Sequence, residues 1–231
     1  MFSLYQNSTT FKYLLEFIFL KMRFNILIGG KAGTGPNILT HLIAEALVKK
    51  GYYVFYSRDY QSLIRGGHNF NVLTFSDSEI FSNDSKTDIL VALDENTEKL
   101  HKNEIKKETI IVKGSQEKHN MYFAGRIFKL LCLDFSVLDN ELKELGKMYE
   151  ENIKEAKQGY NEEKQTACKV IDRNRQKKIY FTNGNKAIAN GALKSGLDIY
   201  YAYPMTPATP ILNELAEKQI ENNILVLELE N

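Results

Sequence analysis

A glycine-rich loop between an apolar run and a helical pattern constrains the fold of this chain more than any other feature. Residues 24–28 are apolar, and residues 29–36 follow them as GGKAGTGP. Residues 37–50 then carry apolar side chains at helical spacing, Gly51 closes that helix, and residues 52–56 form a second apolar run. Strand, loop, helix and strand in this order open a right-handed unit with parallel strands. We therefore predict an α/β domain.

Further short patterns extend this first domain. Phe70, Val72 and Thr74 alternate along the chain, which predicts a strand with one wet face. Residues 88–93 and 109–112 are apolar runs typical of short strands. Helical spacing is expected at residues 95–103, 121–133, 138–156 and 162–170. The first domain is thus expected to span residues 22–170 and to end in helices.

A linker and a second, smaller unit follow. Residues 171–179, with the sequence IDRNRQKKI, are mostly charged and predict a solvated linker. From residue 180 the pattern gives a helix at 186–194, a strand at 197–201, a proline-rich turn, a helix, and a strand at 224–229. About fifty residues with so few strands bury little core. We expect this unit to lean on the first domain or on another subunit, or the sequence to be cut short.

The proline-rich turn, residues 200–210, has the sequence YYAYPMTPATP. Three of the four prolines in the chain stand here, three residues apart, at 204, 207 and 210. Each proline fixes its own φ and keeps the preceding residue extended, so Thr206 and Thr209 are held in a stiff corner. Pro210 suits the first turn of the next helix, with Thr209 as its N-cap. Ligands of parallel α/β domains bind at such strand ends, although an ordinary strand–helix connection rich in proline is the alternative.

Two glycine-containing loops are candidate binding sites. Gly30, Gly33 and Gly35 form G-x-x-G-x-G, which matches neither the dinucleotide fingerprint nor the phosphate loop. The loop still presents backbone amides ahead of a helix, a site that attracts anions; the alternative is a tight turn that needs positive φ. Arg65-Gly66-Gly67-His68-Asn69 combines an accessible backbone with charge and hydrogen-bonding side chains, although a histidine beside glycines is often structural.

Composition excludes several classes of function. The net charge is +1 with acidic and basic residues mixed, which argues against a nucleic-acid or membrane-surface partner. The two cysteines, Cys132 and Cys168, match no metal spacing or disulfide framework and favour a reducing cytoplasm. The other histidines, His41, His101 and His119, are scattered along the chain, so no metal site is predicted.

The first 21 residues contain an apolar cluster at 14–20. This cluster is too short to span a bilayer, it includes Glu16, and it lacks a signal-peptide cleavage site. We expect residues 1–21 to be an extension that the fold does not need. A short surface helix docked on a partner is the alternative.

Taken together, the motifs resemble the 2-oxoacid:ferredoxin oxidoreductases, in the form that fuses a γ domain ahead of the α subunit. IGGKAGTG, GYYVFYSRDYQSLIRGGHN and DILVALD resemble the γ domain, and GNKAIANGALKSGLDIYYAYPMTPAT resembles the start of the α subunit. The likeness covers about residues 22–231. It implies a γ-type three-layer domain with a mainly parallel sheet, followed at 180–231 by the partial start of a pyrimidine-binding α/β domain that binds thiamine diphosphate.

The resemblance also implies a reaction. Members of the family cleave a 2-oxoacid with thiamine diphosphate, transfer the acyl group to coenzyme A, and pass electrons through iron–sulfur clusters to ferredoxin. Thr206 would hydrogen-bond the 2-oxoacid, while Tyr203 and Pro204 would shape its pocket. The carboxylate that activates the cofactor would fall one residue beyond Asn231, with Glu230 as the nearest candidate; a solvated strand end is the alternative for Glu230. The loops at 30–35 and 65–69 would contact coenzyme A or another subunit.

The resemblance assigns the remaining parts of the enzyme to other polypeptide chains. Ala208 and Thr209 replace a usual serine pair of the family. The resemblance implies that Mg²⁺, the diphosphate and a cluster lie on a β subunit. This chain has no C-x-x-C motif for a cluster of its own. We expect the chain to be inactive without that subunit and the remainder of the α subunit. A non-enzymatic nucleotide- or anion-binding or assembly module is the rival interpretation.

Overall fold

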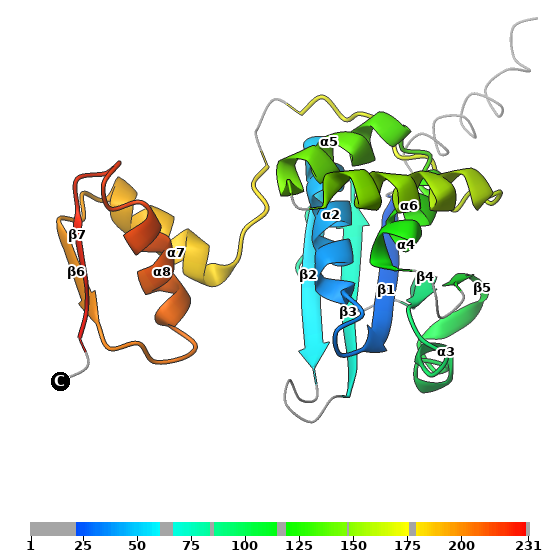
Figure 1. Cartoon of the computed structure of the whole chain (residues 1–231), viewed down its shortest axis with the longest axis horizontal. Coiled ribbons are helices and arrows are strands. Elements are labelled where there is room, and N and C mark those ends of the chain that lie inside the picture. Colours follow the sequence, from blue (N-terminus) through cyan, green and yellow to red (C-terminus); the bar gives the residue numbers. More distant parts are fainter. Residues whose placement is uncertain are drawn as a thin grey trace, which may run out of the picture. The chain divides into compact units, whose positions relative to one another are not determined.

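The computed structural model describes residues 22–60, 67–83, 86–114, 119–146, 148–175 and 179–229. It divides the chain into two compact units, Met1–Ile179 and Tyr180–Asn231. Figure 1 shows both units in the colours of the sequence. The extension expected at 1–21 lies outside the described residues.

A five-stranded sheet forms the centre of the first unit, in the order β2-β3-β1-β4-β5. β1 pairs in parallel with β4, β4 pairs in parallel with β5, and β3 runs antiparallel to both β1 and β2. Four strands therefore point one way and only β3 points the other, which confirms the predicted mainly parallel sheet. The strands are β1 (Arg23–Lys31), β2 (Tyr53–Tyr60), β3 (His68–Ser76), β4 (Thr87–Ala92) and β5 (Ile105–Lys113).

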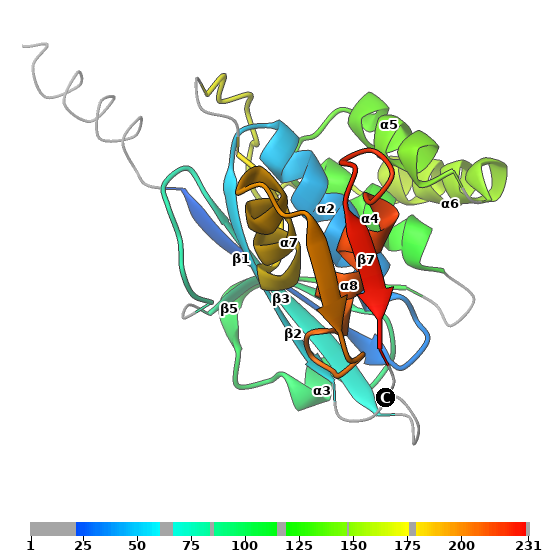
Figure 2. The same ribbon diagram turned by 90° about the vertical axis from the view of Figure 1, so that its left-hand side faces the viewer.

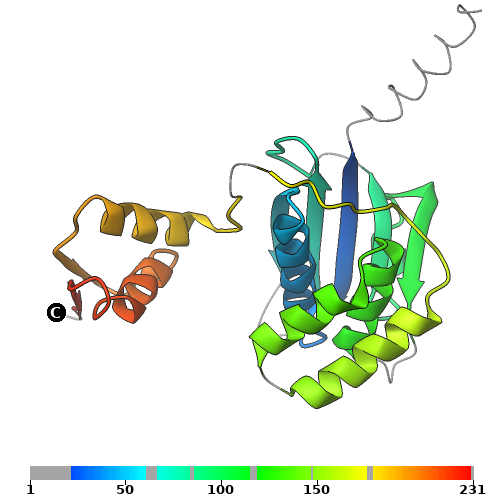
Figure 3. The same ribbon diagram turned by 90° about the horizontal axis from the view of Figure 1, so that it is seen from above.

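Most helices of this unit gather on one face of the sheet, as Figure 3 shows from above. The helices are α2 (Pro36–Lys49), α3 (Thr97–Leu100), α4 (Asn120–Leu130), α5 (Phe135–Leu145) and α6 (Tyr149–Glu162). Asn71 of β3 marks the α2 face, because its amide donates to Oδ1 of Asn37 and Oγ1 of Thr40, each at 3.0 Å. On the opposite face, a Cβ at Gly29 would lie 2.8 Å from Cγ2 of Thr97 in α3. The third layer is thus thin, consisting of the one-turn α3 and loops.

The burial of β3 refines the expected alternation. Leu73 and Phe75 point to the helical face and are fully buried. Phe70 and Val72 point to the thinner layer and are only half-buried, although Thr74 beside them is buried. The strand prediction is confirmed, and the wetter face belongs to Phe70 and Val72.

Two glycines let α4 and α6 cross closely. A Cβ on Gly125 would lie 1.9 Å from the carbonyl oxygen of Ala156, and a Cβ on Gly159 would lie 1.9 Å from the carbonyl oxygen of Tyr122. The backbone of each helix therefore contacts the glycine of the other helix directly. No larger residue fits either position without a movement of a whole helix.

The expected helix at 162–170 is wrong, and the one expected at 138–156 is two helices. Gly146, with φ of +70°, ends α5 in the left-handed conformation before α6 begins. α6 ends at Glu162 because the next carboxylate, Glu163, accepts from Nε of Arg126 and from the amides of residues 164 and 165. The backbone beyond is extended and donates to Leu130 and Leu131 of the α4 end.

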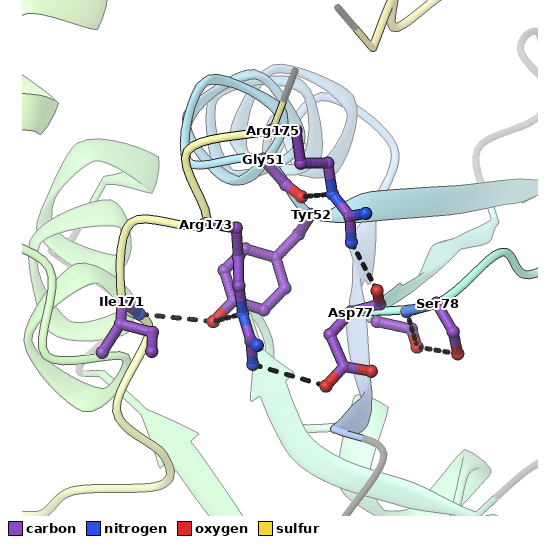
Figure 4. A network of polar contacts seen from close by, with 8 residues as sticks. Gly51, Tyr52, Asp77, Ser78, Ile171, Arg173 and Arg175 are labelled. Atoms are coloured by element: carbon purple, nitrogen blue, oxygen red, sulfur yellow. Dashed lines mark hydrogen bonds and ion pairs between the residues drawn. The ribbon is translucent and has the colours of Figure 1, made fainter. Parts of the chain in front are cut away.

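The segment 171–175 contacts the first unit through specific hydrogen bonds, so the expectation that all of 171–179 is a solvated linker is wrong for this part (Figure 4). The hydroxyl of Tyr52 accepts from the amide of Ile171 and from Nε of Arg173, both at 3.3 Å. Arg173 also pairs with Asp77 at 3.3 Å. Arg175 bonds the carbonyls of Gly51 and Asp77. We call residues 171–175 the strap.

The second unit contains the expected strand, corner and helix. Its elements are α7 (Gly184–Lys194), β6 (Ile199–Ala202), α8 (Thr209–Glu217) and β7 (Leu225–Glu228). β6 and β7 pair in parallel, side by side in Figure 2. Asn183 caps α7 by accepting from the amide of Lys186 at 3.0 Å. The N-cap of α8 is Ala208 rather than Thr209, so that Pro210 is the second helical residue.

One face of the β6–β7 pair is apolar and exposed. The register pairs Ile199 with Leu225 and Tyr201 with Leu227, which places all four side chains on one face. They are between 42% and 67% exposed, whereas Leu212 and Leu215 of α8 are buried. The unit thus has a small core on its helical side.

Candidate functional site

The main candidate site is a cleft at the carboxyl ends of β1 and β4. From β1 the chain passes through α2 to β2 on one side of the sheet, whereas β4 and β5 lie on the other side. The point where connections leave neighbouring parallel strands in opposite directions is where open α/β sheets bind ligands. A cavity of about 630 Å³ lies here, lined by Lys31 and Thr34, by Gly67 and His68, and by residues 93–96 with Leu100.

The glycine loop folds tightly onto the end of β1. Gly33 and Gly35 have φ of +94° and +83°, so both need the left-handed freedom of glycine. Thr34 bonds the carbonyl of Lys31 through its amide at 3.1 Å and through its hydroxyl at 2.8 Å. A Cβ on Gly30 would lie 2.5 Å from that hydroxyl. The positive-φ turn, one of the two alternatives for this loop, is therefore present.

α2 begins at this loop without a side-chain cap. Its N-cap is Gly35, Pro36 fills the first helical position, and its first turn contains no acidic residue. The positive end of the helix dipole is thus not offset by a local carboxylate. This arrangement favours an anionic group beside the loop.

The second predicted loop lies directly against the first. Lys31 pairs with His68 and Gly30 with Asn69 in the β1–β3 ladder. The amide of Ala32 also donates to the carbonyl of Gly67 at 3.1 Å. Two motifs that are far apart in the sequence thus form one edge of the cleft. Arg65 and Gly66, predicted with them, lie outside the described residues.

Asp94 shapes the opposite wall. Its Oδ1 accepts from the amides of Asn96 and Thr97 at 3.0 and 2.9 Å, and from the hydroxyl of Thr97 at 2.8 Å. Burial works against ionisation, but these hydrogen bonds and the nearby His68 hold the pKa of the Asp94 carboxyl below its usual value. Sequence reasoning gave Asp94 no role. Asp94 follows a buried strand, and a threonine stands three residues later. An aspartate in this position often caps a turn, so this pattern could have indicated its role.

A histidine pair occupies the floor beside this wall. Nε2 of His68 lies 2.7 Å from Nε2 of His101, and the ring of Phe70 contacts both. Burial lowers the pKa of His68, which Asp94 partly offsets. Burial and the adjacent His68 lower the pKa of His101. The sequence treated His101 as isolated, because the spacing of residues 68 and 101 shows no pattern until the sheet brings them together.

The corner after β6 belongs to the second unit. Tyr203 and Thr206 are exposed, and Pro204 is half-buried. Backbone bonds from Met205 to the carbonyl of Tyr203, and from Ala208 to the carbonyl of Met205, brace the corner. The amide of Asn185 in α7 also donates to the carbonyl of Pro207 at 3.0 Å. Glu230 lies outside the described residues.

Within the described ranges, His, Cys, Asp and Glu side chains form no group of three or more that could hold a metal ion. No helix in the described part of the chain has both the length and the apolar character needed to cross a membrane.

A family model matches the first unit of the chain. Residues 25–120, which hold the sheet and the cleft, match the family model described as pyruvate ferredoxin/flavodoxin oxidoreductase. This segment, less than half of the chain, is thus similar to the domain that the family model describes.

Two curated relatives narrow the comparison to α subunits. The chain is 42% identical over 76 residues to a 2-oxoacid:ferredoxin oxidoreductase subunit alpha from Sulfolobus. It is 41% identical over 76 residues to the subunit alpha of 2-oxoacid:ferredoxin oxidoreductase 1 from Sulfurisphaera tokodaii. Each match spans 33% of this chain and 12% of the relative, so the chain corresponds to a small part of these proteins.

Two solved structures share the fold. A 2-oxoglutarate:ferredoxin oxidoreductase from Magnetococcus marinus, with 2-oxoglutarate, coenzyme A and succinyl-CoA bound, matches 90% of this chain and 43% of its own. The TM-score is 0.73 and the identity 20%. A pyruvate oxidoreductase subunit from Thermotoga maritima matches 60% of this chain and 96% of its own, with a TM-score of 0.50 and 16% identity. At these identities the likeness concerns the fold.

Proposed function

We propose that the chain is part of a 2-oxoacid:ferredoxin oxidoreductase, which oxidatively decarboxylates a 2-oxoacid to an acyl-CoA and passes the electrons to ferredoxin. The observation that carries this proposal is that one chain holds two features together. Residues 25–120 match the oxidoreductase family model, and a second α/β unit has a braced YPMTP corner. In this proposal residues 22–170 are a γ-type assembly domain, and 180–231 begin a pyrimidine-binding domain.

The cleft of the first unit is the proposed contact for coenzyme A. Its lining includes Lys31 and Thr34 of the loop at 30–35 together with Gly67 and His68, and the uncapped start of α2 follows that loop. These groups suit the phosphates of a nucleotide. The relative from Magnetococcus marinus binds coenzyme A, which supports this choice of ligand. A structure of the complex with coenzyme A far from both loops would contradict it.

The corner of the second unit is the proposed contact for the 2-oxoacid. Thr206 would donate its hydroxyl to the substrate, and Tyr203 and Pro204 would shape the pocket. Because the corner is braced from Met205, Ala208 and α7, little conformational entropy is lost when the hydroxyl binds.

Thiamine diphosphate, the cofactor that the resemblance implies, is not fitted by the described residues alone. They contain no carboxylate or histidine group that could hold Mg²⁺, and the corner residues are exposed. A β subunit is therefore proposed to hold the diphosphate, Mg²⁺ and an iron–sulfur cluster. The remainder of the α subunit is also required in this proposal. Within this chain, Glu230 is the nearest candidate for the carboxylate that activates the cofactor. The chain by itself is then inactive. A cytoplasmic location fits Cys132 and Cys168, both of which are free thiols.

Reconstitution with the partner subunit tests the proposal. The complex should reduce ferredoxin in the presence of a 2-oxoacid and coenzyme A. Thr206→Val should lower kcat/KM by about 10- to 150-fold, since a hydrogen bond to a charged group is worth roughly 1.5–3 kcal/mol. Thr209→Val is the matched control, because the buried Thr209 hydroxyl has no hydrogen-bond partner among the described residues.

The rival class makes a different prediction. A non-enzymatic nucleotide-binding or assembly module would bind adenine nucleotides without a partner, and its complexes would show no 2-oxoacid-dependent electron transfer. Saturable micromolar binding of adenosine diphosphate by the chain, together with an inactive reconstituted complex, would favour the rival.

A further inference from the structure

His68 and His101 form a hydrogen bond between their rings. The two Nε2 atoms lie 2.7 Å apart. Only one hydrogen fits between two nitrogens at this distance, so one ring donates and the other accepts. If both rings were cationic, two N–H groups would face each other. The pair can therefore take up one proton beyond its neutral state, at the unprotonated Nδ1 of the donating ring. The positive charge can then be shared by the two rings through the hydrogen bond between their Nε2 atoms.

The pair is held firmly in place. His101 is only 4% exposed. Gly29 makes room for the His68 ring, since a Cβ there would lie 3.0 Å from its Cε1. Nδ1 of each ring is buried and has no hydrogen-bond partner among the described residues. The neutral pair thus leaves polar atoms unsatisfied beside the cavity that His68 lines.

Carboxylates outnumber cations around the pair even when the cleft holds no ligand, and Glu95 also lines the cavity. Asp94 faces His68 from the loop after β4. Oε1 of Glu104, which follows α3, lies 3.7 Å from Nδ1 of His101, and Asp59 of β2 also acts on that ring. Lys31 contributes a positive charge to the same cleft. The carboxylate of Asp94 is already engaged by three hydrogen bonds, so these neighbours do not suffice to ionise the buried rings.

We infer that the His68–His101 pair takes up one proton when an anion fills the cleft, so that His68 meets the ligand as a cation held in place by His101. The inference rests on the coenzyme A site proposed above. The phosphates add further negative charge beside the rings, and this added charge stabilises the cationic pair that the surrounding carboxylates alone do not stabilise enough. His68 is thus a ligand-binding residue, and His101 is a positioning residue.

Proton uptake makes binding depend on pH in one direction. Below the pKa of the free pair the proton is already present, and above the pKa of the bound pair it is absent in both states. Between the two values the affinity falls by up to about tenfold per pH unit as the pH rises. Coenzyme A carries a phosphate monoester that titrates near pH 6, so affinity alone does not isolate the pair.

Nuclear magnetic resonance of histidine-labelled full-length chain gives the direct test. The four histidines are assigned by single His→Gln variants, and their ring signals are followed from pH 5 to 8 with and without coenzyme A. The titration midpoint of His68 or His101 should rise by about one pH unit on binding, a tenfold change in proton affinity. The exposed His41 on α2, outside the cleft, is the control.

Affinity of the variants gives the second readout. His68→Gln should weaken coenzyme A binding about tenfold at pH 6 and less than twofold at pH 8, whereas a merely structural loss would be equal at both. His101→Phe should show the same selective loss, and His41→Gln should show none. Binding with unchanged midpoints would overturn the inference alone. No binding by the wild-type chain at either pH would overturn the coenzyme A site as well.

Discussion

Asp94 is the side chain on which the turn after β4 depends. Replacing it by asparagine keeps the shape but exchanges a carboxylate acceptor of three hydrogen bonds for a neutral amide. Asp94→Asn should lower the free energy of unfolding by about 1.5–3 kcal/mol at pH 7. Urea unfolding followed by circular dichroism measures this. Glu95→Gln, an exposed neighbour, is the control and should change stability by less than about 0.5 kcal/mol.

The effect of Asp94 should also depend on pH. Its pKa in the folded state lies below the usual value, so its contribution is complete above the unfolded pKa of about 3.9. The contribution is lost as the pH falls through the lower folded pKa. The stability difference between wild type and Asp94→Asn should therefore shrink below about pH 4. A difference that grows on acidification would contradict this assignment.

The residues of the cleft show what a sequence reveals at this scale. Gly33 and Gly35 could be predicted, because local backbone geometry alone requires glycine there. Asp94 and His101 could not be placed, because their neighbours follow from β4 lying beside β1 and from the short α3. Thr209 was wrongly expected to cap α8, since the helix begins one residue earlier than the proline suggests.

At the scale of elements, the crossing of α4 and α6 gives a sharp prediction. Gly125→Ala places a methyl group against the carbonyl of Ala156 and should lower the free energy of unfolding by about 1–3 kcal/mol, despite the better helix propensity of alanine. Gly191→Ala in α7 is the matched control. A Cβ there meets nothing within 4 Å, so it should stabilise its helix by about 0.5–1 kcal/mol. Equal effects of the two substitutions would contradict a tight crossing.

The strap gives a second prediction for an element. Tyr52→Phe keeps the buried ring but removes the hydroxyl that accepts from Ile171 and Arg173. Losing about 1–2 kcal/mol of local stability should speed tryptic cleavage after Arg173 by about 5- to 30-fold. Mass spectrometry identifies the cut. Tyr53→Phe is the control, because Tyr53 offers Arg175 the face of its ring and that face is retained.

The elements themselves were largely predictable, and the exceptions have physical reasons. Apolar runs and helical spacing gave all five strands of the sheet approximately and the helices α2 and α4. The pattern at 162–170 has helical spacing, but Glu163 binds Arg126 and turns the chain out of the helix. The charged residues of the strap predicted a segment surrounded by solvent. Arg173 and Arg175 instead form hydrogen bonds with the turn at residues 50–52 and with Asp77. These partners come together only when the sheet has folded.

At the scale of the whole molecule, the two units should differ greatly in stability. The first unit buries both faces of β1 and β4, whereas the second has a small core and exposes Ile199, Tyr201, Leu225 and Leu227. Hydrogen exchange of the full chain, read by mass spectrometry, should show β6 and β7 exchanging at least about a hundredfold faster than β1 and β4. Adding the proposed partner subunit should slow exchange in β6 and β7 and leave β1 and β4 unchanged, because covering an apolar face stabilises the strands that carry it. Equal protection of the two sheets in the unpartnered chain would contradict the expected difference. Slowing confined to β1 and β4 would instead place the partner on the first unit.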